Sequence, residues 1–267
     1  MKVIASVVLY KHNYDDVKKT LDSLINDESV DKIVLVDNGA HCKWLSNFNM
    51  PKLELIINSF NRGFGAGHNS VFSKYVDSSD YFLVCNPDIS FPKGEISNLY
   101  SYCLENTVDF SIPKILYPDG TLQYACKLLP NPFQLFLRRF LKSAESELNE
   151  KYELRHADYN KPFFAPSFSG CCMLLSNKAV TFSGGFDERF FLYLEDVDLS
   201  RRLSNSELNV AYCPVSKVYH EAQRRSYLNY KFLFYHIIST LKYFNKWGWW
   251  HDVIRAKLNK KCLNQFH

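Results

Sequence analysis

The sequence has no uninterrupted apolar run of the roughly 18 residues that a membrane-spanning helix needs. We expect no targeting segment, because the short apolar run 3–10 leads into the polar residues 11–16 without a small-residue cleavage site. None of its eight cysteines forms a C-x-x-C pair, which argues against a zinc site of the usual spacing. Several cysteines lie inside apolar runs, so we expect buried free thiols in a cytoplasmic protein.

The composition is that of a globular protein large enough to bury a core, with 267 residues, 46% of them hydrophobic and 22% charged. Charge is unevenly spread. Residues 221–267 hold nine Lys or Arg against two acids, a net charge of +7, which leaves −3 for residues 1–220. We expect a catalytic domain over 1–222 and basic, amphipathic helices over 223–267, facing an anionic surface.

Strand and helix patterns alternate in the first half of the chain. Continuous apolar runs predict buried strands at 3–10, 32–36, 53–57 and 81–85, and helical spacing predicts helices at 15–25 and 69–76. This alternation indicates an α/β fold with a mostly parallel sheet, in which ligands bind beyond the carboxyl ends of the strands. In the second half we expect a turn within 112–123, an irregular stretch with a short helix over 130–166, and strands at 169–175 and 208–212. Helices are expected at 194–203 and from 227 onward.

The glycine-rich segment 63–68 first resembles a dinucleotide fingerprint. It fails because the sixth position of G-x-G-x-x-G is His68, and because the segment follows the third strand instead of the first. The glycines predict either a close approach of the backbone to another group or a tight turn.

Acidic side chains follow two of the expected strands. Asp37 could accept a hydrogen bond from a ligand such as a pyrimidine N3–H, or could occupy an N-cap or turn position. Asp88, in Asn86-Pro87-Asp88, has no basic residue within four positions, which suits Mg²⁺ or Mn²⁺ but also suits a turn. The residues alone leave both alternatives open.

The most informative segment is 190–198, where three acids follow an aromatic run. Glu195 and Asp196 at a helix start would interact favourably with the helix dipole. The same dipole lowers the pKa of a carboxyl group, so a general base at this place needs burial to counter it. Asp198 precedes Arg201 and Arg202 by three and four residues, which predicts ion pairs between them.

The ordered set of motifs resembles the family 2 glycosyltransferases of the GT-A fold, and within them the bacterial rhamnosyltransferase branch that builds O-antigen and related surface polysaccharides. The resemblance covers roughly residues 3–245. It implies a Rossmann-like, mostly parallel sheet that binds a nucleotide-diphospho-sugar, followed by a C-terminal helical extension. The matching segments are the strand ending at Tyr10, Asp37-Asn38-Gly39, Asn61 to Gly65 with Asn69, Asn86-Pro87-Asp88, Ser169 to Leu174, Gly184 to Asp187, Glu195 to Leu199 with Arg202, and His220.

The resemblance also implies roles for single residues. Asp37 would recognise the pyrimidine base of the donor by accepting a hydrogen bond from it. The rest of the nucleotide-sugar pocket would consist of Tyr10, Asn61, Arg62, Gly63, Asn69 and Asn86. Asp88 matches the last acid of the family's D-x-D motif, whose first acid is Asn86 here, and would bind Mg²⁺ or Mn²⁺ together with His220. Asp196 matches the catalytic base, and Glu195 would orient the acceptor or support that base.

The implied reaction is an inverting, metal-dependent transfer of L-rhamnose from dTDP-L-rhamnose to a hydroxyl of a polyprenyl-diphosphate-linked saccharide. A UDP-hexose donor is the alternative. The aromatic and basic residues within 228–250 would lie on the anionic inner face of the cytoplasmic membrane, unless this helix packs back on the core. Arg138 and Arg139 would meet the acceptor diphosphate.

Two other classes of protein are weighed against this one. A sugar nucleotidyltransferase would have a glycine-rich basic loop after the first strand, but Lys11-His12-Asn13 contains no glycine. A carbohydrate-binding or scaffolding protein would not need Asp88 and Asp196 together, and would keep its whole function when Asp196 is replaced by Asn.

Overall fold

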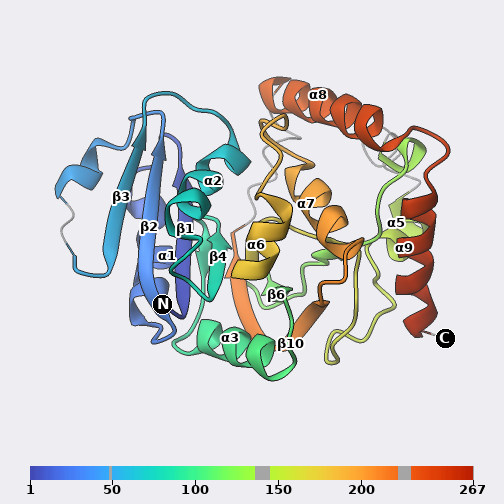
Figure 1. Cartoon of the computed structure of the whole chain (residues 1–267), viewed down its shortest axis with the longest axis horizontal. Coiled ribbons are helices and arrows are strands. Elements are labelled where there is room, and N and C mark those ends of the chain that lie inside the picture. The colour runs from blue at the N-terminus through green and yellow to red at the C-terminus, as the bar shows by residue number, and fades with distance from the viewer. Residues whose placement is uncertain (48–49, 136–144, 222–229, 267) are drawn as a thin grey trace.

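The computed structural model describes residues 1–47, 50–135, 145–221 and 230–266, and strands and helices alternate in its first half as the sequence predicts (Figure 1). The first half contains β1 (Val3–Leu9), α1 (Tyr14–Asn26), β2 (Val30–Asn38), β3 (Leu53–Asn58), α2 (Phe64–Tyr75), β4 (Tyr81–Cys85), β5 (Ile89–Ser90) and α3 (Glu95–Glu105). The second half contains β6 (Phe110–Leu116), β7 (Cys126–Lys127), α5 (Glu145–Tyr152), β8 (Ser167–Phe168), β9 (Cys172–Ser176), α6 (Asn177–Ser183), α7 (Glu195–Ser204), β10 (Val210–His220), α8 (Tyr230–Trp247) and α9 (Val253–Leu263). Short 3₁₀ helices lie at Lys43–Asn47 and Asn264–Phe266.

The main sheet has eight strands in the order β3-β2-β1-β4-β9-β6-β10-β5. β1 pairs in parallel with β2 and β4, and β6 pairs in parallel with β10. β9 runs antiparallel to both β4 and β6, and β5 runs antiparallel to β10. The sheet is therefore mostly parallel, as predicted, and the carboxyl ends of β1, β2, β4 and β10 lie along one edge.

Continuous burial explains why the central strands were recognisable in the sequence. Every residue of β1 and β4 is buried, because helices cover the parallel part of the sheet. α2 packs against β1 and β2, while α1 packs against β2 and β5. The apolar, β-branched composition of these strands reflects this two-sided burial.

Within the described residues, three of the expected elements differ from their expected boundaries by more than two residues. α2 begins at Phe64, five residues before the expected start, because the glycine-rich segment is itself the first turn of the helix. β9 begins at Cys172, because Gly170 and Cys171 leave the sheet to contact neighbouring loops. β10 extends to His220, well past the expected end at Tyr212, because its pairing with β6 resumes at Lys217 after an irregularity.

The middle of the chain follows the prediction of irregular structure. A turn at Tyr117 to Thr121 and an antiparallel bridge between Leu116 and Leu122 form the expected hairpin-like feature. Between residues 130 and 166, α5 is the short helix that was predicted. Arg138 and Arg139, as well as the expected domain boundary at 222 and 223, lie outside the described residues.

The C-terminal segment is helical, as predicted, and α8 lies above α7 and the loop before it in Figure 1. Two amide side chains attach α9 and the residues just after it to the rest of the protein. Each of them both accepts a hydrogen bond from and donates one to the backbone of a single residue, as a paired strand does. Asn259 accepts from the N–H of Leu129 and donates to its carbonyl, at 2.8 and 3.0 Å. Gln265, just after α9, does the same with Phe164, at 2.9 and 3.0 Å. Among the described residues, no helix combines the length and the apolar character that a membrane crossing requires.

All eight cysteines are free and buried, which confirms the prediction of buried thiols. They are distributed over the sheet, the helices and the connecting loops, from Cys42 near the end of β2 to Cys262 in α9.

Candidate active site

Asp37 lies at the carboxyl end of β2 and is almost fully buried. Its two carboxylate oxygens accept hydrogen bonds from the backbone N–H groups of His41 and Cys42, at 3.0 and 2.8 Å. This is the turn-stabilising role that the sequence left open as one alternative. Each oxygen keeps a second lone pair, so contact with a nucleotide base stays a prediction.

Asn38, the next residue, organises the loop that follows β3. Its side chain donates to Asn61 Oδ1 at 3.0 Å and to the carbonyl of Gly63 at 2.8 Å. Asn61 Oδ1 in turn accepts from the N–H of Gly63 at 2.8 Å. The ends of β2 and β3 are thereby tied to the start of α2, and Asn61 serves as part of that tie.

The three glycines at the start of α2 allow close contact with other parts of the protein. A Cβ atom on Gly63, which has φ of +102°, would lie 2.3 Å from the carbonyl oxygen of Phe191. On Gly65 it would lie 2.6 Å from Phe186 Cβ, and on Gly67 it would lie 2.7 Å from Val8. The predicted close approach is therefore confirmed, and the approaching groups are protein side chains and backbone.

Asn69 and Arg62 join α2 and its preceding loop to residues 186–188. Asn69 accepts from the N–H of Phe186 at 2.8 Å and donates to its carbonyl at 2.9 Å. Glu188 accepts from Asn69 at 3.1 Å and forms an ion pair with Arg62 at the surface. In this structure both predicted pocket residues hold the loop that leads to α7, and their contact with a nucleotide stays a prediction.

Tyr10, at the end of β1, is partly exposed and meets the ring of His41 edge-on, with 5.4 Å between ring centroids. Beside it lies a pocket with a volume of about 450 Å³. Its lining residues are Lys11, His12, Asn13, His41, Lys43 and Trp44. The carboxyl ends of β1 and β2 thus border a pocket of basic and aromatic character.

Asp88, in the turn after β4, and His220, at the end of β10, come together although 132 positions separate them in the sequence. Asp88 Oδ1 is buried, accepts no hydrogen bond within the described chain, and lies 3.4 Å from His220 Nε2. The other ring nitrogen of His220 lies 3.0 Å from Gln123 Oε1, which fixes the orientation of the imidazole. Burial disfavours the charged imidazole, but Cys171 and Asp88 raise the pKa of His220 to about 10.

This pair fits a divalent cation of the Mg²⁺ or Mn²⁺ type. The carboxylate oxygen without a partner would supply one ligand, and the oriented imidazole would supply a second once metal binding displaces its proton. Such ions take their remaining ligands from water and substrate phosphates. Among the described residues, no group of three or more His, Cys, Asp or Glu side chains gathers to form a complete protein cage. The backbone N–H of Asn86 donates to the carbonyl of Cys171 at 2.8 Å, and a contact of its side chain with the donor stays a prediction.

Glu195 and Asp196 begin α7. Asp196 accepts hydrogen bonds from the N–H groups of Gly170 and Val197, at 2.9 and 2.8 Å. Burial raises the pKa of Asp196 even though these amides oppose the rise. Burial and the neighbouring Asp196 charge raise the pKa of Glu195 well above its usual range, and Glu195 Oε2 has no partner in the described structure. The burial that a general base needs at this place is therefore present.

One short segment links the two acidic centres. Gly170 donates to Asp196, and the next residue, Cys171, accepts from Asn86 through its carbonyl. Asn86, two residues before Asp88, and Asp196 thus contact adjacent residues of the same short segment. A Cβ on Gly170 would approach Asp196 Cβ to 3.0 Å, so the absence of a side chain permits this proximity.

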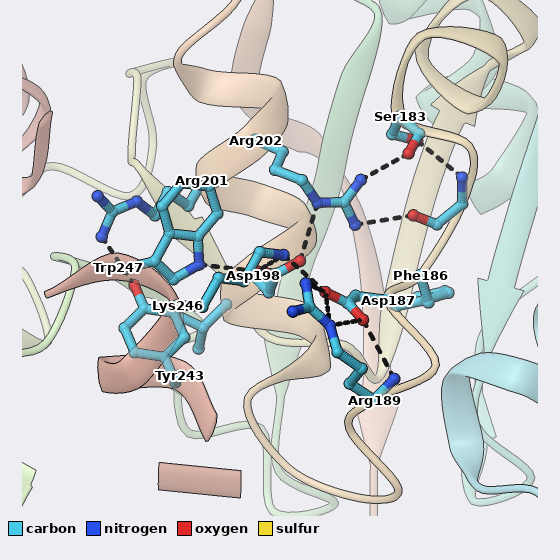
Figure 2. Close-up of polar contacts among 12 residues, drawn as sticks. Ser183, Phe186, Asp187, Arg189, Asp198, Arg201, Arg202, Tyr243, Lys246 and Trp247 are labelled. Atoms are coloured by element: carbon cyan, nitrogen blue, oxygen red, sulfur yellow. Dashed lines mark hydrogen bonds and ion pairs between the residues drawn. The ribbon is translucent and has the colours of Figure 1, made fainter. Parts of the chain in front are cut away.

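Asp198, one turn into α7, is completely buried and has three partners (Figure 2). Arg202 Nε donates to it at 2.8 Å, as predicted, and Lys246 and Trp247 of α8 donate at 2.5 and 2.8 Å. The prediction that Arg201 also pairs with Asp198 is wrong. Arg201 leaves α7 on another side and forms a bidentate pair with Asp252, with both distances 2.6 Å.

Sequence reasoning missed several residues around the site. Gln123 orients His220, Glu188 holds Arg62 and Asn69, and Lys127 of β7 lowers the pKa of Asp196 through its charge. Each is distant in sequence from its partner and belongs to no recognisable motif. Gly170 and Cys171 belonged to an expected small-residue strand and to a segment that matches the family, but neither pattern indicated that they contact both acidic centres.

Comparison with known proteins agrees with this geometry. The family model described as Glycosyl transferase family 2 matches residues 6–179. An N-acetylglucosaminyl-diphospho-decaprenol L-rhamnosyltransferase of Mycobacterium tuberculosis is 25% identical over 256 residues, which cover 88% of this chain and 82% of that protein. The rhamnosyltransferase WbbL of Escherichia coli is 26% identical, with 89% of this chain and 91% of the relative covered.

Two further matches widen the comparison. The low-salt glycan biosynthesis hexosyltransferase Agl10 of Haloferax volcanii is 24% identical, with 80% of this chain and 66% of that protein covered. Among solved structures, GalNAc-T7 with UDP, GalNAc and Mn²⁺ superposes with a TM-score of 0.61 at 13% identity. The match covers 82% of this chain and 43% of that chain, and it confirms the predicted GT-A fold.

Proposed function

The chain belongs to glycosyl transferase family 2, and on this premise we propose that it transfers L-rhamnose from dTDP-L-rhamnose to a hydroxyl of a polyprenyl-diphosphate-linked saccharide, with inversion. The names of two relatives support rhamnose as the transferred sugar, and the name of the M. tuberculosis enzyme also supports a lipid-diphosphate-linked acceptor. Assembly of O-antigen or another surface polysaccharide is the process that such a transfer serves.

The observation that carries the proposal is that one short segment, residues 170–171, contacts two acidic centres. In the first, Asp88 Oδ1 lacks a hydrogen-bond partner in the described structure and lies 3.4 Å from His220 Nε2. In the second, burial raises the pKa of Asp196. A site for a leaving diphosphate beside a site for a base is the arrangement that a single displacement requires.

In this mechanism Asp196 accepts the proton of the acceptor hydroxyl as its oxygen attacks the anomeric carbon. The bond from that carbon to the diphosphate breaks on the opposite face, so the configuration inverts. Asp37 and the loop 61–63 would bind the nucleotide, and Asp88 and His220 would hold the divalent cation. When bound, Mg²⁺ or Mn²⁺ stabilises the negative charge that develops on the leaving diphosphate.

We further propose that the protein works on the cytoplasmic face of the membrane, with α8 against anionic lipid. One face of α8 exposes Tyr230, Phe234, Ile237 and Leu241, whose spacing of four, three and four residues forms a continuous stripe. Lys231 and Lys242 are exposed on the same helix. Apolar and basic groups together favour binding to an anionic interface.

The test is a donor panel: dTDP-rhamnose, UDP-glucose, UDP-galactose and UDP-N-acetylglucosamine, each titrated with and without Mg²⁺ or Mn²⁺. Metal-dependent preference for dTDP-rhamnose is expected, with weaker donor binding in D88N. D196N should bind the donor normally but lose transfer. Preference for a UDP-sugar would leave the mechanism and replace the donor, in line with the hexosyltransferase relative. If no nucleotide-sugar binds, the proposed transfer reaction is refuted.

A further inference from the structure

The loop before α7 has a strained backbone next to the two acids. We call residues 187–194 the strap. At its end, Tyr193 and Leu194 have φ of +70° and +64°, and Leu194 is the N-cap of α7. Left-handed backbone conformations are unfavourable for residues with a Cβ atom, and two in succession persist only where the surroundings enforce them. The direction in which Glu195 and Asp196 leave the loop therefore depends on what holds the strap.

α8 holds the strap along its length, in antiparallel order. Lys246 Nζ donates to Asp187 at 2.7 Å, and Lys242 Nζ donates to the carbonyl of Arg189 at 2.6 Å. Further along, the hydroxyl of Ser239 donates to the carbonyl of Leu192 at 2.8 Å. Ring contacts complete the set, with centroid distances of 4.7 Å for Phe191–Tyr235 and 5.4 Å for Tyr193–His236. The face of α8 that contacts the strap is thus distinct from its exposed apolar stripe.

Lys246 also connects the strap to α7. Its ammonium group lies between Asp187 of the strap and Asp198 of α7, which is the arrangement drawn in Figure 2. Only 17% of the Lys246 side chain is exposed, and the Asp198 side chain is fully buried. The two ion pairs of Lys246 therefore join the start of the strap to the first turn of α7, in surroundings that screen charge poorly.

The other side of the strap contacts the loop that precedes α2. The N–H of Phe64 donates to the carbonyl of Phe191 at 3.0 Å, and Gly63 packs against that same carbonyl. The strap therefore lies between the residues expected to bind the nucleotide and the C-terminal helix. A displacement of the strap would move both the start of α7 and the support of residues 61–64.

We propose that Ser239 and Lys246 of α8 are positioning residues, which hold the strap and thereby place Asp196 for proton transfer. The proposal rests on the proposed function of Asp196 as the base. Ser239 is the sharper case. Its hydroxyl is buried, and the carbonyl it contacts lies only three residues before Glu195. Neither residue touches the reacting groups, so both act through the strap.

The experiment compares S239A with T240A. The Thr240 hydroxyl donates to the carbonyl of His236 within α8 itself, so T240A removes a neighbouring hydroxyl without touching the strap. Loss of one hydrogen bond of about 1 kcal/mol corresponds to roughly a fivefold change. We therefore expect S239A to lower kcat about fivefold while the donor Kd stays within twofold, and T240A to leave both unchanged. K246M should lower kcat further, and K246R, which keeps a donor for both acids, should restore most of it.

Amide hydrogen exchange of residues 190–197 gives a readout that does not require activity. Faster exchange in S239A than in T240A is expected, with equal exchange in the central strands. If S239A matches T240A in both exchange and kcat, the proposal is overturned. If S239A lowers kcat and donor binding in proportion to a lost folded fraction, the role is structural and the proposal also fails. Should the wild type transfer no sugar, the proposed function fails, and exchange alone still decides whether α8 holds the strap.

Discussion

Replacing Asp252 by Asn tests how firmly the C-terminal helices are joined to α7. The carboxylate of Asp252 is 2% exposed and receives both terminal nitrogens of Arg201, whose side chain is 1% exposed and lies over Trp247 at 4.2 Å. Asp252 is also the N-cap of α9, where it accepts from the N–H of Arg255. Because Asn is an equally good N-cap, D252N removes the charge and keeps the cap.

The expected loss is large because the Arg201 charge stays buried without its partner. Breaking one side of a buried pair typically costs about 3–5 kcal/mol. For a protein of this size, that corresponds to a fall in Tm of roughly 6 to 15 °C. Urea unfolding and calorimetry measure both quantities. The matched control is D158N, because Asp158 also caps a turn but pairs with the exposed Lys161 at 3.7 Å. That change should stay within about 0.5 kcal/mol.

The direction of the pKa shift of Asp252 determines how its contribution to stability changes with pH. Burial by itself would raise the pKa of Asp252, but hydrogen bonds from Arg201 outweigh it and hold the pKa below its usual value. The stabilisation is therefore complete above about pH 4, the pKa of an unfolded aspartate, and is lost as the pH falls through the lower folded pKa. The gap between wild type and D252N should close in that acidic range. A D252N protein as stable as D158N at pH 7 would refute the reasoning, as would a failure of R201M/D252N to recover part of the loss.

Three further outcomes are expected. G63A should lose more than about 2 kcal/mol in urea unfolding, because its Cβ would meet Phe191, whereas G120A, with φ of +85° and nothing within 4 Å, should lose only about 1 kcal/mol. The acidic limb of the kcat–pH profile should lie above the ordinary aspartate value near 4, because burial raises the pKa of Asp196; a limb at or below pH 4 would contradict this. F234S should lower the fraction of protein that sediments with anionic vesicles, while V253S, which replaces an exposed residue outside the stripe, should not. Equal binding of the two variants would argue against the membrane contact.

The parallel core was predictable from the sequence because its burial is two-sided. β4 was located correctly at both ends, since each of its residues is buried and the chain turns at Asn86-Pro87. The glycines of 63–67 were correctly linked to a close approach, but their partners lie more than 120 residues away or in another strand. The spacing of the glycines within one segment predicts that another group can approach the backbone closely there. Only the folded structure shows which group that is.

The contacts around α7 show which interactions can be predicted from spacing within one helix and which cannot. The contact from Asp198 to Arg202 spans four residues and follows from helix geometry. The contacts from Lys246 and Trp247 span nearly fifty residues and connect two elements whose relative placement no periodicity encodes. Arg201 was assigned to the wrong acid because a position three residues along a helix allows a contact without requiring it. The basic, aromatic tail was predicted to be a lipid-facing helix, with packing on the core as the alternative. That one face of α8 would contact the strap was not predictable, because no spacing within the tail identifies residues 187–194 as its partner.

The buried cysteines have a practical consequence for following the motions of this protein. Burial raises the pKa of the thiols of Cys85 and Cys172 in the sheet and of Cys262 in α9. A thiol reagent reacts with the thiolate, so each of these groups is protected until its surroundings open. Pulse alkylation followed by peptide mass analysis therefore yields a separate opening rate for each region, without any introduced label. A faster rate at Cys262 than at Cys85 would measure how often the C-terminal helices detach while the sheet stays closed.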